Sequence, residues 1–322
     1  MQQYKSLDMF KIIAAILVVA IHTQLLCGTE AGYYIRCLCR IAVPFFFVCS
    51  SYLFWSKHGS IKKYTKRILL LYFVWLILSL PYVVNSFFMN SNSAAYNVAQ
   101  FVRGLLFHNT FHASWYLMSS VIAMNLVYWL SKRLSNKILQ TIGMALYLFS
   151  LLSCSYHGVT DKIGINTWYP FFEQLFVPSN SFFVAFIYIV IGKLIAEKDS
   201  VSSLKKSIIL SAQFLILGGA EIYFVREWTK FTDAFVFLPF FTYFFFQFLL
   251  NIKINTNDEV CRVFRKMSII VYLSHYFFID LHLQYGTTLG SKLFFIVATE
   301  ALILSASIVF LSNKIKLLRY LY

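Results

Sequence analysis

Residues 7–27, LDMFKIIAAILVVAIHTQLLC, form a long apolar stretch in which the ionisable side chains are Asp8, Lys11 and His22. A helix needs about 20 mostly apolar residues to cross the hydrocarbon core of a bilayer. The stretch is therefore predicted to be a transmembrane helix. We expect it to be retained rather than cleaved, because the bulky Leu26 before Cys27 does not suit a lipoprotein cleavage box.

The composition of the whole chain agrees with this first segment. Of the 322 residues, 59% are hydrophobic and 13% are charged, whereas soluble domains average about 45–50% apolar and about 25% charged residues. This excludes an ordinary cytosolic enzyme and a nucleic-acid-binding domain. The six cysteines include no CxxC pair, so neither a metal site nor a required disulfide is predicted.

Further apolar segments predict an all-α polytopic membrane bundle of about ten transmembrane helices, forming one domain over residues 1–322. The predicted spans are 7–27, 38–57, 67–89, 114–131, 137–155, 180–197, 206–225, 234–252, 266–284 and 291–312.

The basic residues predict the orientation of these spans. With the N-terminus in the cytoplasm, 20 lysines and arginines fall on the inner side and seven on the outer side. An excess of Lys and Arg marks cytoplasmic loops. The pattern therefore predicts that both termini are cytoplasmic, in a multi-pass protein of a bacterial-type plasma membrane. Membrane topology alone explains most of the net charge of +15.

The polar residues of the first helix are candidates for function, because ionisable groups at membrane depth are costly. At 100° per residue, Lys11 and His22 differ by only about 20° around the helix, and Asp8 shares their face. We predict that Lys11 contacts Asp8 near the cytoplasm and that His22 lies in the outer half, with both facing one hydrated passage. The alternative is that Lys11 extends to the lipid surface and His22 only bonds a neighbouring helix.

Other polar residues add to this set. His275 lies in the ninth span, and His112 begins the fourth, so two or three histidines reaching one interior would handle protons. The alternative for His275 is a structural hydrogen bond to a backbone carbonyl. The alternative for His112 is a role as an interfacial anchor. Glu300 in the tenth span, and secondarily Glu221 and Asp280, could orient a histidine, bind an acceptor or pair with Arg40 or Lys11.

Several short motifs and their order along the chain resemble the acyltransferase 3 family of integral membrane proteins. The family has a basic residue and a histidine separated by ten residues in its first helix, and here Lys11 replaces the usual arginine. A second departure is an extra residue in HASWYL. The motifs are FKIIAA through AIH (10–22), RIAVPFFF (40–47), SSYL (50–53), KRI (66–68), HASWYL (112–117), IGK (191–193) and IVYLSH (270–275).

This resemblance implies transfer of an acyl group, usually acetyl, from cytoplasmic acyl-CoA to a small-molecule or cell-envelope acceptor at the outer face. His22 is then the candidate base, with Lys11, His275, Tyr272 and Glu300 completing the catalytic set. Acetyl-CoA would be bound by Lys66 and Arg67, with Lys62 and Lys63. The candidate acceptor or cavity residues are Arg40, His112, Trp115, Tyr116 and Asp8.

Within that family, the stretch DAFVFLPF (233–240) is similar to the membrane domains of VanT-type serine racemases from vancomycin-resistance clusters. Those proteins continue into a cytoplasmic racemase domain, and we expect this chain to correspond to the membrane portion alone, with such a domain fused or associated. Two further hypotheses follow: a module that binds or imports L-serine for a racemase, and a catalytically inactive membrane anchor.

Overall fold

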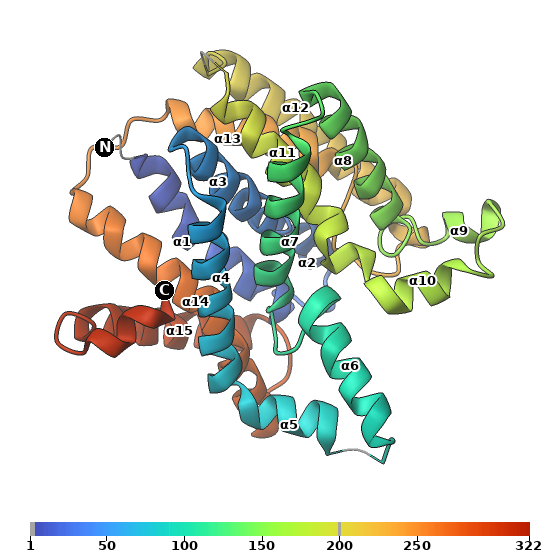
Figure 1. Ribbon diagram of the computed structural model, residues 1–322, viewed down its shortest axis with the longest axis vertical. Helices are drawn as coiled ribbons and strands as arrows, with labels where there is room; N and C mark the ends of the chain where they lie inside the picture. Colours follow the sequence, from blue (N-terminus) through green and yellow to red (C-terminus); the bar gives the residue numbers. More distant parts are fainter. Residues whose placement is uncertain (1–3, 90, 199–200) are drawn as a thin grey trace.

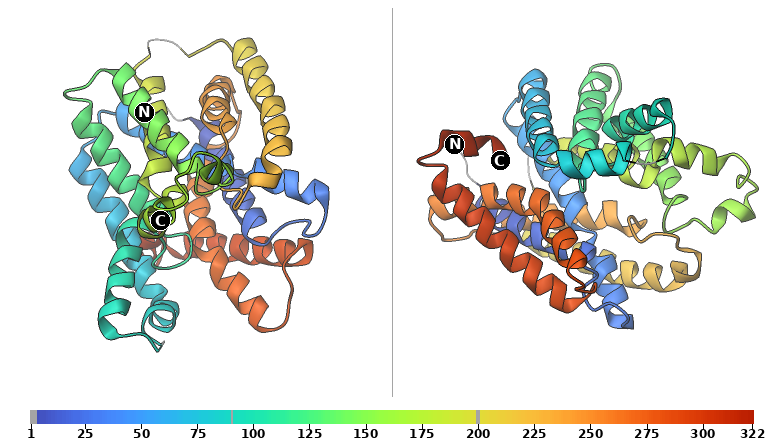
Figure 2. Two further views of the ribbon diagram at one scale, coloured as in Figure 1. Left: turned by 90° about the vertical axis from the view of Figure 1, so that its right-hand side faces the viewer. Right: turned by 90° about the horizontal axis from the view of Figure 1, so that it is seen from below.

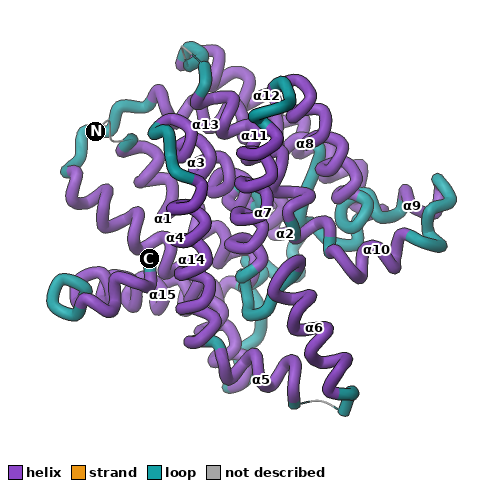
Figure 3. The backbone as a smooth tube through the Cα atoms, viewed as in Figure 1, coloured by secondary structure: helices purple, strands orange, loops and turns teal. Residues whose placement is uncertain are grey.

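The computed structural model describes residues 4–89, 91–198 and 201–322, and within these ranges the chain forms helices and no β-strand (Figure 3). The predicted all-α membrane bundle is confirmed. Each predicted span overlaps one principal helix: α1 (Lys5–His22), α3 (Ala42–Ser56), α4 (Ile61–Leu78), α7 (Trp115–Leu130), α8 (Asn136–Leu151), α11 (Phe182–Ala196), α12 (Leu204–Val225), α13 (Phe237–Asn251), α14 (Asp258–Gln284) and α15 (Ser291–Leu311).

How many of these helices cross the membrane stays a prediction. Among the described residues, four helical segments are long and apolar enough to span a bilayer, and a fifth qualifies if a bent pair of helices counts as one span. The four segments are Glu30–Ser56, Tyr169–Ala196, Leu204–Trp228 and Ser291–Leu311.

Two predicted spans differ from the structure. The span 67–89 was expected to be one helix, but α4 ends at Leu78 and α5 (Leu80–Phe88) turns away by 75°. Pro81 lies in the first turn of α5, where its missing N–H is tolerated, and it disfavours a helix continuing through this point. The first span also ends early, at His22, because Gln24 and Leu26 have φ values of 54° and 55°.

Short helices occupy several of the connections between the predicted spans. The α5–α6 hairpin projects from the body of the bundle in Figure 1 and in the left panel of Figure 2. The additional helical segments are α2 (Glu30–Cys39), α6 (Ala94–Phe107), α9 (Val159–Lys162), α10 (Tyr169–Phe176), η1 (Pro178–Asn180), η2 (Arg226–Trp228) and η3 (Lys316–Leu321).

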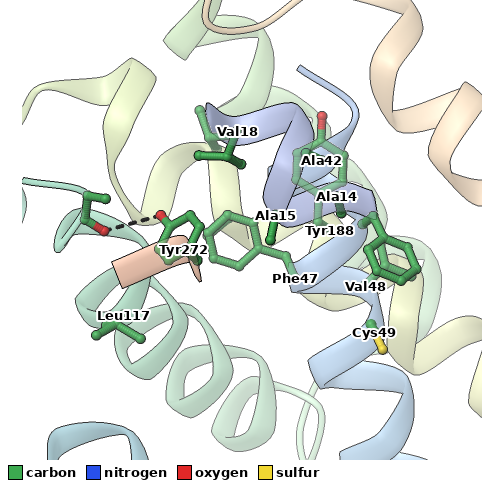
Figure 4. Packing of buried hydrophobic residues seen from close by; sticks show 14 of the residues in the cluster. Ala14, Ala15, Val18, Ala42, Phe47, Val48, Cys49, Leu117, Tyr188 and Tyr272 are labelled. Atoms are coloured by element: carbon green, nitrogen blue, oxygen red, sulfur yellow. Dashed lines mark hydrogen bonds between the residues drawn. The ribbon is translucent and has the colours of Figure 1, made fainter. Parts of the chain in front are cut away.

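The core lies where α1, α3, α11 and α14 meet. Helix α1 packs along α14 and α3, and α11 packs against α3, α7 and α8 (Figure 1). Figure 4 shows Ala14, Ala15 and Val18 of α1 in this core, with the Phe47 ring of α3 beside Ala15. Small side chains such as these alanines allow two helices to approach closely.

The connections group as the charge pattern predicts. One set of contacts joins the predicted inner connections: Lys5 with Asp258, Asn251 with Ser202, and Asn136 with Glu197. A second set joins the predicted outer connections: Thr23 with Gly290, Cys154 with Lys230, and Glu30 with Arg226. The cytoplasmic location of the termini stays a prediction.

Candidate functional site

The inner part of the α1–α14 interface contains a buried ion pair. Lys11 Nζ lies 2.8 Å from Asp8 Oδ1, which confirms the predicted contact between residues three positions apart. Arg265 of α14 lies 3.7 Å from the other carboxylate oxygen. Because the side chains of Lys11 and Asp8 are only 11% and 6% exposed, the alternative in which Lys11 reaches the lipid surface is wrong.

The outer part of the same interface contains the predicted histidines. His22 Nδ1 lies 2.7 Å from the hydroxyl oxygen of Tyr276 on α14, and the rings of His22 and His275 stack with centroids 5.4 Å apart. His275 Nδ1 lies 3.3 Å from the carbonyl oxygen of Val271, so the carbonyl contact considered as an alternative is present. However, His275 Nε2 is buried and has no partner among the described residues.

His112 extends this cluster from the segment before α7. Its Nε2 lies 3.2 Å from Asp280 Oδ2, and its ring stacks on Tyr276 with centroids 4.1 Å apart and planes inclined by 8°. The hydroxyl of Tyr272 donates to the carbonyl oxygen of Ala113 at 3.1 Å. Tyr272 therefore holds the segment that carries His112, rather than presenting a free hydroxyl.

The HASWYL motif contains an unusual backbone conformation. Ala113 has φ of 61°, which is unusual for a residue other than glycine. This turn directly follows His112, whose ring stacks on Tyr276. Trp115 and Tyr116 follow in α7 and pack on Phe47, with the Tyr116 hydroxyl 3.4 Å from Ser50 Oγ.

Two pockets lie near the histidine cluster on the predicted outer side, one lined in part by His112 and Tyr276 and the other by Arg40. One, of about 20 Å³, has room for a single water molecule, and its lining includes Tyr82, His112, Tyr276 and Asp280. The other is a cleft of about 290 Å³ beside Arg40, which lies close enough to His22 to interact with it electrostatically. Its lining residues are Tyr33, Arg40, Arg226, Thr229, Lys230, Phe231, Thr232 and Asp233.

Arg40 is anchored in this cleft by Asp233, whose carboxylate lies 2.8 Å from its guanidinium. Its Nε and the Tyr33 hydroxyl are buried without a partner among the described residues. A buried donor without a partner is costly. Arg40 and Asp233 place charges of both signs in the lining of the cleft.

The expected open passage between Lys11 and His22 is absent from the described structure. Ala15 and Val18 lie on the shared face of α1 between the two polar residues, and they are 0% and 1% exposed (Figure 4). Zero exposure leaves no room for a water molecule beside these side chains. The inner ion pair and the outer histidine cluster are thus separated by a packed apolar layer.

The remaining predicted site residues lie elsewhere. Glu300 places both carboxylate oxygens 2.9–3.0 Å from His282 Nε2, about two turns along α14 from His275. On α4, the predicted donor-binding residues are all exposed, and none of them forms an ion pair with a described carboxylate: Lys62, Lys63, Lys66 and Arg67.

From the sequence, one residue of the histidine cluster was missed and another was ranked low. Tyr276 was not considered, and Asp280 was placed behind Glu300. Their spacing carries a usable signal, because Tyr272, Tyr276 and Asp280 follow one another at intervals of four residues and therefore share a face of α14. That stripe of hydroxyl and carboxylate groups is the face turned toward His22 and His112.

The fold and this buried polar cluster define a polytopic membrane protein with a candidate catalytic centre, and comparison with known proteins assigns its family. Residues 4–312 match the acyltransferase domain model of the acyltransferase 3 family. The match covers nearly the whole chain, so the protein belongs to this family.

Curated relatives carry racemase names. Two proteins named amino-acid racemase from Enterococcus faecalis are 29% and 25% identical over 69% and 84% of this chain. A serine/alanine racemase from Enterococcus gallinarum is 26% identical over 77% of the chain. The matched regions are only 32%, 40% and 37% of these relatives, so the chain spans about a third to two fifths of their length. No solved structure matches the chain.

Proposed function

We propose that this protein is an acyltransferase of the bacterial plasma membrane that transfers an acyl group, in the simplest case acetyl, from cytoplasmic acetyl-CoA to an acceptor at the outer face. The observation that carries the proposal is the contact of His22 with Tyr276 beside the unpaired His275 Nε2, near one pocket lined by Tyr276 and another lined by Arg40. A neutral imidazole held by a partner on one nitrogen keeps the other free to accept a proton.

In the reaction, His22 removes the proton from an acceptor hydroxyl or amine as this group attacks the thioester carbonyl. A new C–O or C–N bond forms, the C–S bond breaks, and CoA leaves as the thiolate. Because His275 Nδ1 donates to the Val271 carbonyl oxygen, its Nε2 keeps a lone pair that can accept a hydrogen bond from the acceptor beside His22. Tyr272 positions His112 through Ala113, and Glu300 has a structural role with His282.

The donor is expected to bind on the inner side, where the exposed bases of α4 suit the phosphates of CoA. Lys11 and Asp8 then lie between this surface and the apolar layer. The structure corresponds to a closed state, because Ala15 and Val18 separate Lys11 from His22. Transfer therefore requires α1 and α14 to separate along this layer when the donor binds.

The acceptor is expected to enter through the cleft at Arg40. A volume of about 290 Å³ is at the lower end of ligand pockets, which favours a small molecule or one terminal group of a cell-envelope polymer. Arg40, with its unpaired Nε, would orient the acceptor against His22.

Inverted membrane vesicles test this function, because their outward-facing cytoplasmic surface receives added acetyl-CoA. Release of free CoA should fall at least about 100-fold in His22→Ala, the range expected for a general base. Lys66→Gln with Arg67→Gln should raise the acetyl-CoA concentration needed for half-maximal rate. Lys132→Gln with Arg133→Gln is the matched control, from another predicted inner connection. Wild-type vesicles that release no more CoA than His22→Ala vesicles would refute the proposal.

A second candidate function is supported by the names of the relatives. The membrane domain would bind or import L-serine for a fused or associated cytoplasmic racemase, in the cell-wall chemistry of vancomycin resistance. The mixed charges of the Arg40 cleft, which include Asp233, suit a zwitterion. Saturable serine uptake into proteoliposomes that ignores acetyl-CoA and is lost in His22→Ala would favour this function. If the protein shows neither serine uptake nor CoA release, the remaining hypothesis is a catalytically inactive membrane anchor.

A further inference from the structure

We infer that Tyr276, His112 and Asp280 form a proton-release path that carries the proton taken up by His22 to the outer surface of the protein. This inference rests on the proposed function and adds positioning residues to it. The path starts at the contact between Tyr276 and His22 and ends at the partly exposed His112–Asp280 pair.

The direction of release follows from the packing around His22. The imidazole must lose its proton before the next acceptor can be activated. Toward the inner side, the face of α1 is closed by Val18 and Ala15, which leave no space for water. Toward the outer side, the Tyr276 hydroxyl lies 2.7 Å from His22 Nδ1, and Tyr276 also lines the pocket that has room for one water molecule. The polar groups through which the proton can leave His22 therefore lie toward the outer side.

The proton balance of the path is simple. In the resting state, His22 Nδ1–H donates to the Tyr276 oxygen, and Nε2 keeps its lone pair. After Nε2 has taken the acceptor's proton, Nδ1 gives its hydrogen to the Tyr276 oxygen, and the original Tyr276 hydrogen passes to water in the pocket. The water gives a proton to the His112–Asp280 pair, which releases it to solvent. No bond to carbon changes. The relay leaves His22 with hydrogen on Nε2, and turning the ring then brings Nε2–H to Tyr276 and the Nδ1 lone pair to the acceptor side, which readies the base for the next cycle.

The charges around the path favour this direction. Asp280 lies 3.2 Å from His112 Nε2, and the two side chains are 38% and 30% exposed, so a proton held between them has access to solvent. Arg40 opposes positive charge on His22, but its guanidinium is paired with Asp233. The titratable and charged groups facing His22 and Tyr276 are His275, His112, Arg40, Asp280, Asp233 and Tyr82.

The tautomer of His22 provides a test that does not require turnover. In protein with ¹⁵N-labelled histidine, the His22 nitrogen shifts should report hydrogen on Nδ1 in the wild type. In Tyr276→Phe this preference should be lost, whereas Tyr285→Phe, at an exposed tyrosine just beyond α14, should leave it unchanged. A wild-type His22 with hydrogen only on Nε2 would overturn the inference.

Turnover in inverted vesicles supplied with acetyl-CoA tests the release step. Tyr276→Phe should reduce CoA release about 10–100-fold at an unchanged half-saturating acetyl-CoA concentration. His112→Ala should be slow and partly rescued by millimolar imidazole, because the lost ring borders an accessible pocket. His58→Ala, at an exposed histidine of an inner connection, should keep the wild-type rate with and without imidazole.

Asp280→Asn should reduce CoA release as Tyr276→Phe does, because it removes the carboxylate that lies 3.2 Å from His112 Nε2 at the exit of the path. If His22→Ala is inactive but Tyr276→Phe and Asp280→Asn keep the wild-type rate, the path is wrong and the acyltransferase function stands. If the wild type matches His22→Ala, the function itself has failed. The melting temperature of each variant verifies that it is folded.

Discussion

The buried ion pair of α1 should respond asymmetrically to removal of either partner. In Asp8→Asn, Lys11 loses the carboxylate 2.8 Å away and remains buried with its charge uncompensated. In Lys11→Met, Asp8 keeps Arg265 at 3.7 Å, and Arg265 is exposed enough to adapt its position. We therefore expect Asp8→Asn to be the more destabilising substitution.

The distances set the size of this difference. With an effective dielectric constant of about 20, opposite charges attract by about 6 kcal/mol at 2.8 Å and about 4 kcal/mol at 3.7 Å, before screening by solvent. Loss of one partner of a buried pair typically costs about 3–5 kcal/mol. This range is expected for Asp8→Asn, whereas the remaining attraction of Arg265 should limit the cost of Lys11→Met to about 1–2 kcal/mol.

The free energy of unfolding, measured by reversible denaturation in mixed micelles, tests this order. The double variant Asp8→Asn/Lys11→Met should be less destabilised than Asp8→Asn alone, because it no longer contains a buried unpaired cation. Arg262→Gln, one turn before Arg265 on α14, is a control for loss of a positive charge near the inner surface. Equal costs for the two single variants, or a larger cost for Lys11→Met, would refute the reasoning.

Four further substitutions, one of them a control, test local features of the fold. Ala113→Gly should raise the free energy of unfolding by about 1 kcal/mol, since glycine accepts the φ of 61° without strain, and an unchanged melting temperature would argue against that conformation. Gly192→Ala should lower the free energy of unfolding by about 1–3 kcal/mol, because the new Cβ would lie 2.5 Å from Ser51 Cβ. In the same unfolding experiment, the control Gly219→Ala should be neutral or stabilising, because its Cβ meets no neighbouring atom. Glu221→Ala should cost about 1–2 kcal/mol, because this carboxylate accepts two backbone N–H groups at the start of α13, and a neutral effect would contradict this capping role.

The predicted roles of the acidic residues show where sequence reasoning stopped. Glu221 and Glu300 were both expected to serve a histidine, an acceptor or a cation near the site. The structure uses Glu221 to cap α13 and joins Glu300 to His282, which was not among the predicted site residues. A carboxylate at membrane depth must find a partner, but the partner lies on another helix, and the sequence does not state which helices touch.

The sequence by itself determined the properties that depend on one helix at a time. Apolar stretches placed the ten principal helices, and helical periodicity placed Lys11 within reach of Asp8. These features follow from the local geometry of the α-helix and from the cost of polar groups in lipid. The bend after Leu78 was missed although Pro81 signals it locally.

Only the tertiary structure decided which faces meet. It placed Tyr276 against His22 and His112 against Asp280, and it closed the space between Lys11 and His22 with Ala15 and Val18. Such contacts join residues up to 254 positions apart. They depend on how helices interlock in the bundle, and periodicity within any single helix holds no information about that.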